Sequence, residues 1–265
     1  MNKSPLGVFD SGIGGLTVAR ALFERLPHES VIYFGDTARV PYGPKSPDTV
    51  RRYSGEILAY LLQRGVKAVV VACNTSTAHA LGYLKERSSV PVVGVIEPGA
   101  RAAVAATKTG TIGVIGTAGT VASGAYERAI KALRADARVH SQPCPLFVPL
   151  VEEGWFEHPA AELIAREYLE PLKRAKVDVL VLGCTHYPLL KPLLVRVMGP
   201  DVTLVDSAEE TATAVSKELE RLDLLSNGGG SHEHRFVVSD DDPHFRKVGA
   251  LFLGEKLKQV EVVTL

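Results

Sequence analysis

Two cysteines in this chain of 265 residues stand where a thiol could take up or release a proton. Cys73 follows the apolar run 68–72 and precedes Asn-Thr-Ser-Thr, residues that begin helices well. Cys184 follows a similar apolar run, and His186 lies two residues further on. The positive end of a helix dipole and a protonated histidine both favour the thiolate form of a cysteine. A lone cysteine is usually a small buried apolar residue, so the case for chemistry depends on the two being equivalent.

The surroundings of the two cysteines belong to a longer repeat. The segment Lys67-Ala-Val-Val-Val-Ala-Cys-Asn-Thr75 is echoed by Val177-Asp-Val-Leu-Val-Leu-Gly-Cys-Thr-His186. Earlier in each half, Gly7-Val-Phe-Asp-Ser11 is echoed by Gly113-Val-Ile-Gly-Thr117, and each leads into a turn that contains glycine. The same order at a nearly constant offset predicts an internal duplication. Chance similarity between β–α units is the other explanation, and the matching cysteines favour duplication over it.

The turn Asp10-Ser-Gly-Ile-Gly-Gly15 is a second place where chemistry could occur. Its glycines would expose backbone N–H groups near a helix N-terminus, which suits an anion such as a carboxylate or a phosphate. The spacing matches neither a Walker phosphate loop nor a dinucleotide-binding fingerprint, so a nucleotide cofactor gets little support. A tight turn whose glycines relieve steric crowding explains the same residues equally well.

The elements that must position these residues alternate along almost the whole chain. Short runs rich in Val, Ile and Leu, without strict alternation, are typical of parallel strands buried on both faces. They are residues 6–9, 31–34, 68–72, 90–96, 111–115, 138–141, 178–183 and 202–205. Helical patterns lie between them, among them residues 16–26, 47–64, 160–174 and 208–222. This alternation predicts an α/β fold with mostly parallel sheets and right-handed crossovers.

The repeat predicts two similar domains, each a mostly parallel sheet flanked by helices. We expect residues 1–97 plus 208–265 to form the first domain and residues 98–207 the second. The chain would cross between them near 97–99 and again near 206–208, where Ser207 and Glu210 predict a capping-box start for the last long helix. The polar stretch 226–231 is a predicted loop, and residues 234–239 and 260–265 are predicted late strands.

Composition argues against several classes of protein. Lys plus Arg and Asp plus Glu number 30 each, whereas nucleic-acid binders normally carry a basic surface. The N-terminus has no apolar core of signal-peptide length, and the uncharged stretch 109–126 reads as strand, turn and helix rather than a membrane span. Three cysteines suit a reducing cytosol, so we expect a cytoplasmic protein. Cys144 lies between two prolines, has no counterpart in the repeat and is interpreted as structural.

Other groups give weaker signals. The Cys-x-His pair at Cys184 and the His-x-His pair at His232 could each supply two metal ligands, but no closely spaced cysteine pair joins them, so we expect no metal. No lysine stands in a recognisable setting for pyridoxal phosphate. Of the adjacent acids Glu152 and Glu153, a position at the end of a predicted strand makes one a candidate for the site.

The chain resembles the glutamate racemases of the cofactor-independent aspartate/glutamate racemase family over essentially its whole length. Six motifs in order carry the resemblance: Phe9-Asp-Ser-Gly-Ile-Gly-Gly15, Tyr33-Phe-Gly-Asp36, Val40-Pro-Tyr-Gly43, Ala72-Cys-Asn-Thr-Ser-Thr77, Cys144-Pro-Leu-Phe-Val-Pro-Leu-Val-Glu-Glu-Gly154 and Leu182-Gly-Cys-Thr-His-Tyr-Pro188. Each motif alone is weak, but their order is highly specific.

The resemblance implies roles for particular residues. Cys73 and Cys184 would be the acid and base thiols, facing each other across a cleft between the domains. Asp10, Glu152 and His186 would be auxiliary groups that tune the thiols. The residues that would hold the substrate are Asp10, Ser11, Tyr42, Gly43, Asn74, Thr75, Thr185 and His186.

The same resemblance implies an activity and a setting for it. The activity would be interconversion of L-glutamate and D-glutamate without a cofactor, and the D-glutamate would supply peptidoglycan synthesis. It also implies a homodimer. Three rivals remain open: a racemase for aspartate or another acidic substrate, a two-lobed protein that binds an amino acid without inverting it, and a thiol redox enzyme. The last is disfavoured by the lack of a Cys-x-x-Cys pair.

Overall fold

The structure is a computed structural model that describes residues 3–226, 232–241, 243–253, 257 and 259–265. Its first sheet has the strand order β10-β9-β2-β1-β3-β4, and every pair of neighbours is parallel. Its strands are β1 (Leu6–Asp10), β2 (Val31–Gly35), β3 (Ala68–Val71), β4 (Val92–Gly94), β9 (His234–Val238) and β10 (Val260–Val262). The predicted loop at 226–231 falls almost wholly outside the described residues.

The second sheet has the order β6-β5-β7-β8 and is also parallel throughout. Its strands are β5 (Thr111–Gly116), β6 (Arg138–Pro143), β7 (Val179–Gly183) and β8 (Thr203–Asp206). This order repeats the order β2-β1-β3-β4 of the first sheet, so β3 and β7, which precede the two cysteines, hold equivalent places. The predicted fold class, two parallel sheets flanked by helices, is confirmed.

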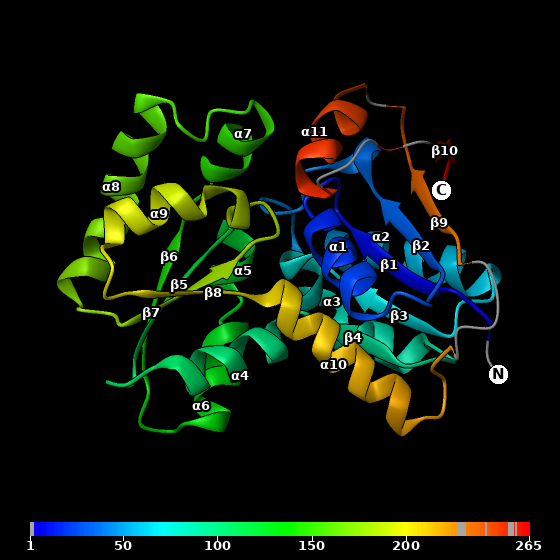
Figure 1. Cartoon of the computed structure of the whole chain (residues 1–265), viewed down its shortest axis with the longest axis horizontal. Coiled ribbons are helices and arrows are strands. Elements are labelled where there is room, and N and C mark those ends of the chain that lie inside the picture. The colour runs from blue at the N-terminus through cyan, green and yellow to red at the C-terminus, as the bar shows by residue number, and fades with distance from the viewer. Residues whose placement is uncertain (1–2, 227–231, 242, 254–256, 258) are drawn as a thin grey trace.

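Helices cover both sheets, and in Figure 1 each sheet with its helices forms a separate lobe. Those in the first half of the chain are α1 (Leu16–Arg25), α2 (Pro47–Gln63), α3 (Asn74–Arg87), α4 (Ile96–Ala106), α5 (Ala118–Ala122) and α6 (Ala125–Leu133), with the 3-10 turn η1 (Thr37–Arg39). The others are α7 (Phe147–Glu152), α8 (Pro159–Arg174), α9 (Lys191–Met198), α10 (Ser207–Arg221) and α11 (Pro243–Leu253), with η2 (Tyr187–Leu190). We call the lobe around β1 the first lobe and the lobe around β5 the second lobe.

The chain crosses between the lobes through two helices. It leaves the first sheet after β4 and enters α4, and it returns after β8 through α10, which runs beneath the first lobe in Figure 1. Two predictions here need correction. Residues 90–96 form a shorter strand, because the helix already begins at Ile96. The cap of α10 is Asp206 rather than Ser207, since Asp206 Oδ1 accepts a hydrogen bond of 2.9 Å from the N–H of Ala208.

The segment before Glu152 was predicted as a strand, and this prediction is wrong. Residues 147–152 form the short helix α7. Its buried residues are Phe147, Leu150 and Val151, which have the i, i+3, i+4 spacing of one helical face. A short apolar run can be read as either element from periodicity alone.

Burial explains why the strands lack alternation. All residues of β1, β2, β5 and β7 are buried, because helices cover both faces of each sheet. Just before β3 and β2 begin, the ammonium group of Lys67 and the carboxylate of Glu29 form a buried ion pair of 2.5 Å. The same two side chains bind the backbone of Leu224 and Ser226, so they anchor the segment that follows α10. Among the described residues, no helix combines the length and apolar character needed to cross a membrane.

Candidate active site

The two cysteines lie at the carboxyl ends of equivalent strands and line the same small cavity. Cys73 follows β3 and caps α3, where its Sγ accepts a hydrogen bond of 3.4 Å from the N–H of Ser76. Cys184 follows β7 directly. Both side chains are buried. Residues that come from both lobes line the cavity: Ser11, Pro41, Tyr42, Gly43, Cys73, Asn74, Thr75, Thr117, Val148, Cys184, Thr185 and His186.

This cavity is tightly closed. Its volume is about 30 Å³, whereas pockets that hold small molecules usually have about 300–1,000 Å³. The closure includes a backbone bond between the lobes, in which the N–H of Gly119 donates to the carbonyl of Gly43 over 3.0 Å. A Cβ at Gly43 would come within 2.9 Å of Thr117, so a larger residue there would hold the lobes apart.

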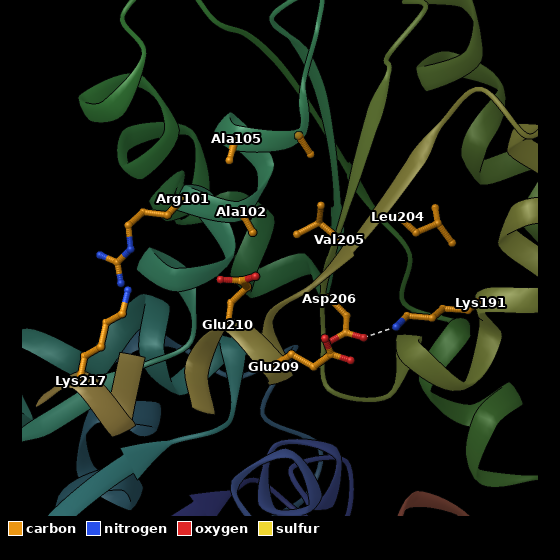
Figure 2. A pocket seen from close by; sticks show the side chains of 11 residues that line it. Arg101, Ala102, Ala105, Lys191, Leu204, Val205, Asp206, Glu209, Glu210 and Lys217 are labelled. Atoms are coloured by element: carbon orange, nitrogen blue, oxygen red, sulfur yellow. Dashed lines mark hydrogen bonds and ion pairs between the residues drawn. The ribbon is translucent and has the colours of Figure 1, made fainter. Parts of the chain in front are cut away.

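A much larger cavity, of about 600 Å³, lies elsewhere, between α4, β8 and α10. Figure 2 shows that its walls carry both cations and carboxylates, among them Arg101, Lys217 and the ion-paired Lys191 and Asp206. None of the predicted site residues lines it. Size therefore does not identify the candidate site, whereas the chemistry of the lining residues does.

The glycine turn at the start of α1 binds a carboxylate from its own chain. Asp10 is fully buried, and its Oδ2 accepts a hydrogen bond of 3.0 Å from the N–H of Gly12. A Cβ at Gly15 would lie 2.4 Å from the Cβ of Asp10, so the turn also needs glycine for space. The turn therefore fits both predictions made for it. Its glycines relieve steric crowding, and its N–H groups bind an anion, which here is the carboxylate of Asp10.

Asp10 also reaches the second lobe. Its Oδ1 accepts a hydrogen bond of 3.3 Å from the hydroxyl of Thr185. Burial raises the pKa of Asp10, while the charge of His186 and the hydrogen bonds from the turn oppose that rise. The carboxylate is thus a buried acid between the two cysteine-bearing strand ends.

Cys184 lies beside a charged pair. Nδ1 of His186 is 3.9 Å from Sγ of Cys184, and Nε2 of His186 is 2.9 Å from Oε1 of Glu152. Burial alone would lower the pKa of His186, but its hydrogen bonds with Cys184 and Glu152 outweigh burial and raise that pKa to about 10. His186 is therefore an imidazolium at neutral pH, and its positive charge stabilises negative charge on the neighbouring sulfur.

The surroundings of Cys73 disfavour the thiolate form of its side chain. Burial raises the pKa of its thiol to about 11, and the carboxylate of Asp10 adds to that rise, against hydrogen bonds with Ser76 and Ser11. The thiol lies 3.7 Å from the hydroxyl of Ser11. At neutral pH Cys73 is therefore protonated.

Polar side chains beside Cys73 bind partners from the second lobe. The Oδ1 of Asn74 accepts a hydrogen bond of 2.7 Å from the hydroxyl of Tyr126, while its buried Nδ2 has no partner in the part of the chain that the structure describes. The hydroxyl of Thr75 lies 2.9 Å from that of Thr117 and 3.2 Å from that of Thr120. These contacts join the carboxyl end of β3 to the second lobe.

Tyr42 lines the cavity with its ring rather than with an available hydroxyl. The ring packs with Val50 and Cys73. Its hydroxyl donates to the buried carboxylate of Asp36, which also binds Arg39 at 2.8 Å. Asp36 thereby holds the segment that carries Tyr42 and Gly43 in place.

Every predicted site residue lines the cavity except Asp10 and Glu152. Each of these two binds a residue that does, Thr185 and His186 respectively. Sequence reasoning missed Thr117, which also lines the cavity. The repeat contained that signal, because Thr117 stands in the second half where Ser11 stands in the first.

Within the described part of the chain, no three His, Cys, Asp or Glu side chains are grouped as metal ligands would be. The ring of His234 stacks on Phe23 with their centroids 3.8 Å apart. His232 lies next to His234, with 5.8 Å between ring centroids, and both are remote from the cysteine cavity.

Comparisons with known proteins agree on one family. The family model described as Asp/Glu/Hydantoin racemase matches residues 15–215. The glutamate racemase of Geobacter metallireducens is 54% identical over 260 residues, which cover 98% of this chain and 96% of that protein. Among solved structures, the glutamate racemase isoform RacE1 of Bacillus anthracis has a TM-score of 0.96 at 42% identity and covers 100% of this chain and 99% of its own. The glutamate racemase of Francisella tularensis, solved in complex with D-glutamate, has a TM-score of 0.94 at 38% identity and covers 100% and 98%.

Proposed function

This chain belongs to the Asp/Glu/hydantoin racemase family of isomerases, and we propose that it interconverts L-glutamate and D-glutamate with two cysteine thiols and no cofactor. The observation that carries the proposal is the pair of buried thiols, Cys73 and Cys184, which line one cavity from equivalent strand ends of opposite lobes. Relatives named glutamate racemase, one of them solved with D-glutamate, support the choice of substrate.

Inversion at the α-carbon needs a base on one side and an acid on the other. One sulfur removes the α-proton, the bonding electron pair stays on the carbon, and the other sulfur delivers its proton to the opposite face. Cys73 is the thiol of the resting site, and the imidazolium of His186 beside Cys184 would stabilise the thiolate that this step needs. Each turnover leaves the two sulfurs in exchanged protonation states, ready for the reverse reaction.

The α-proton of an amino acid is a very weak acid, so the site must stabilise the negative charge that develops. The Nδ2 of Asn74 is a buried amide donor that no other described residue binds, in a residue that lines the cavity. Thr75 and Thr185 line it as well, although the hydroxyl of Thr185 donates to Asp10 in this closed form. Such donors, aimed at the α-carboxylate, stabilise the charge that spreads onto it from the carbon.

The closed cavity implies that the lobes separate to admit a substrate. A volume of about 30 Å³ is too small for an amino acid, and the bond between Gly43 and Gly119 must break to enlarge it. Closure around glutamate would then exclude water and strengthen the contacts to the developing charge.

The test is inversion in deuterated water. Purified protein is incubated with D-glutamate alone, and optical rotation and α-deuterium are followed by NMR. We expect L-glutamate that carries solvent deuterium to form early, while the remaining D-glutamate stays mostly unlabelled. Binding without inversion or exchange would favour an amino-acid binding protein. Faster inversion of aspartate than of glutamate would make aspartate the substrate.

Cysteine variants test the two-thiol mechanism. We expect Cys73→Ala and Cys184→Ala each to abolish inversion while the fold remains intact by circular dichroism. Cys144→Ala is the matched control, because Cys144 is also buried but lies outside the cavity. Full activity in either of the first two variants would refute the mechanism, and a disulfide between Cys73 and Cys184 in the active protein would revive the redox alternative.

The family resemblance also supports proposals about the location, the oligomeric state and the cellular role of the protein. We propose that the protein acts in the cytoplasm as a homodimer and supplies D-glutamate for peptidoglycan synthesis. Expression in a bacterial strain that depends on added D-glutamate tests the role in the cell wall, since growth without the supplement is expected. Light scattering of the purified protein tests the dimer.

A further inference from the structure

Tyr126 touches both cysteine-bearing strand ends. It lies in α6 of the second lobe and is buried. Its ring covers the backbone of Gly183, the residue before Cys184, since a Cβ at Gly183 would come within 3.0 Å of that ring. Its hydroxyl donates to Oδ1 of Asn74, the residue after Cys73, over 2.7 Å.

The hydroxyl of Tyr126 determines which way the amide of Asn74 points. The phenol has a single proton and donates it to Oδ1 of Asn74, so the amide presents its oxygen to Tyr126. The nitrogen Nδ2 is then the end of Asn74 that remains for a ligand, and it has no partner among the described residues.

We propose that Tyr126 is a positioning residue that aims the Nδ2 donor of Asn74 at the α-carboxylate of the substrate. The inference rests on the proposed function and adds to it a residue from the opposite lobe. Because Tyr126 and Asn74 lie in different lobes, their bond can form only when the lobes are together. The donor is therefore oriented at the same time as the cavity closes.

The variant Tyr126→Phe removes the hydroxyl and keeps the ring on Gly183. Without the phenol proton, the amide of Asn74 is free to turn its oxygen toward the substrate carboxylate, where it would repel rather than donate. We expect kcat/KM for glutamate to fall by about tenfold, the effect of losing one well-placed hydrogen bond. Tyr168→Phe is the matched control, because Tyr168 lies in α8 of the same lobe and does not line the cavity.

A double-mutant cycle separates positioning from general packing. Asn74→Ala, Tyr126→Phe and the double variant are compared with the unmodified protein by kcat/KM and by thermal unfolding. If Tyr126 acts through Asn74, the tyrosine change has no further effect once the amide is gone, so the double variant matches Asn74→Ala within about twofold. A role in packing alone would lower kcat/KM by the same factor in both backgrounds.

Each outcome is decisive. Multiplicative losses, or a Tyr126→Phe variant as active as Tyr168→Phe, would overturn the positioning role while leaving the racemase intact. An unmodified protein that neither inverts nor binds glutamate, measured by calorimetry, would refute the proposed function and this inference with it. Non-additive losses with unchanged thermal unfolding would support both.

Discussion

The charge on Glu152 can be removed without changing the shape of the side chain. In Glu152→Gln, the partner of His186 Nε2 becomes a neutral amide of nearly the same size. His186 is buried, and its hydrogen bonds and electrostatic interactions with Cys184 and Glu152 raise its pKa against the cost of burial. Loss of the carboxylate weakens one of those two supports and leaves the other in place.

The expected shift follows from the strength of that bond. A hydrogen bond between charged groups contributes about 1.5–3 kcal/mol, and a shift of one pKa unit corresponds to about 1.4 kcal/mol. The pKa of His186, about 10 in the unmodified protein, should therefore fall by about one to two units. The imidazolium beside Cys184 would then be lost at a correspondingly lower pH.

The assay is the pH dependence of kcat/KM for inversion of glutamate. We expect the alkaline limb to move to lower pH by about one to two units in Glu152→Gln. Glu153→Gln is the matched control, since Glu153 is adjacent but exposed. The two enantiomers have equal free energy, so kcat/KM must agree in both directions, which checks the data. Superimposable profiles for both variants and the unmodified protein would refute this account of His186.

Stability offers a second readout of the same charge. Because the pKa of His186 is higher in the folded protein than in the unfolded chain, its contribution to stability is complete below about pH 6.5. It is lost as the pH rises toward 10. Between these values the melting temperature of the unmodified protein should fall more than that of Glu152→Gln. Equal changes of melting temperature with pH in the two proteins would show that Glu152 does not keep His186 protonated.

Two further substitutions test the packing around the site and the core. A Cβ at Gly14 would lie 2.5 Å from Nδ1 of His186, so Gly14→Ala should lower kcat/KM by at least tenfold by holding the lobes apart. Gly82→Ala, with open space around it in α3, should keep full activity and raise stability by about 0.5–1 kcal/mol in denaturant unfolding. Lys67→Met breaks a buried ion pair and should cost about 3–5 kcal/mol, against less than about 1 kcal/mol for the exposed Lys131→Met. Equal costs for the two lysine variants would contradict the role given to burial.

Much of the fold could be predicted because its signals are local. Uninterrupted apolar runs indicate strands buried on both faces, and the repeated strand, turn and helix pattern places Cys73 and Cys184 at equivalent ends. The misassigned elements lie where local signals are ambiguous. The run before Glu152 is short enough to be strand or helix, and burial of Phe147, Leu150 and Val151 on one side decided for a helix. Asp206 and Ser207 are both good capping residues, and only backbone geometry selects Asp206.

The amino-acid sequence by itself determined which strand ends carry thiols and which polar residues follow them, because neighbours along the chain share one element. Tertiary structure alone decided the partners that set the charge and direction of those groups. Glu152 reaches His186 and Tyr126 reaches Asn74 across 34 and 52 positions of sequence. Such pairs depend on how helices pack between two lobes, and no local pattern records that packing. The protonation of Cys73 and of His186 follows from it, since burial and neighbouring charge arise only when the lobes are together.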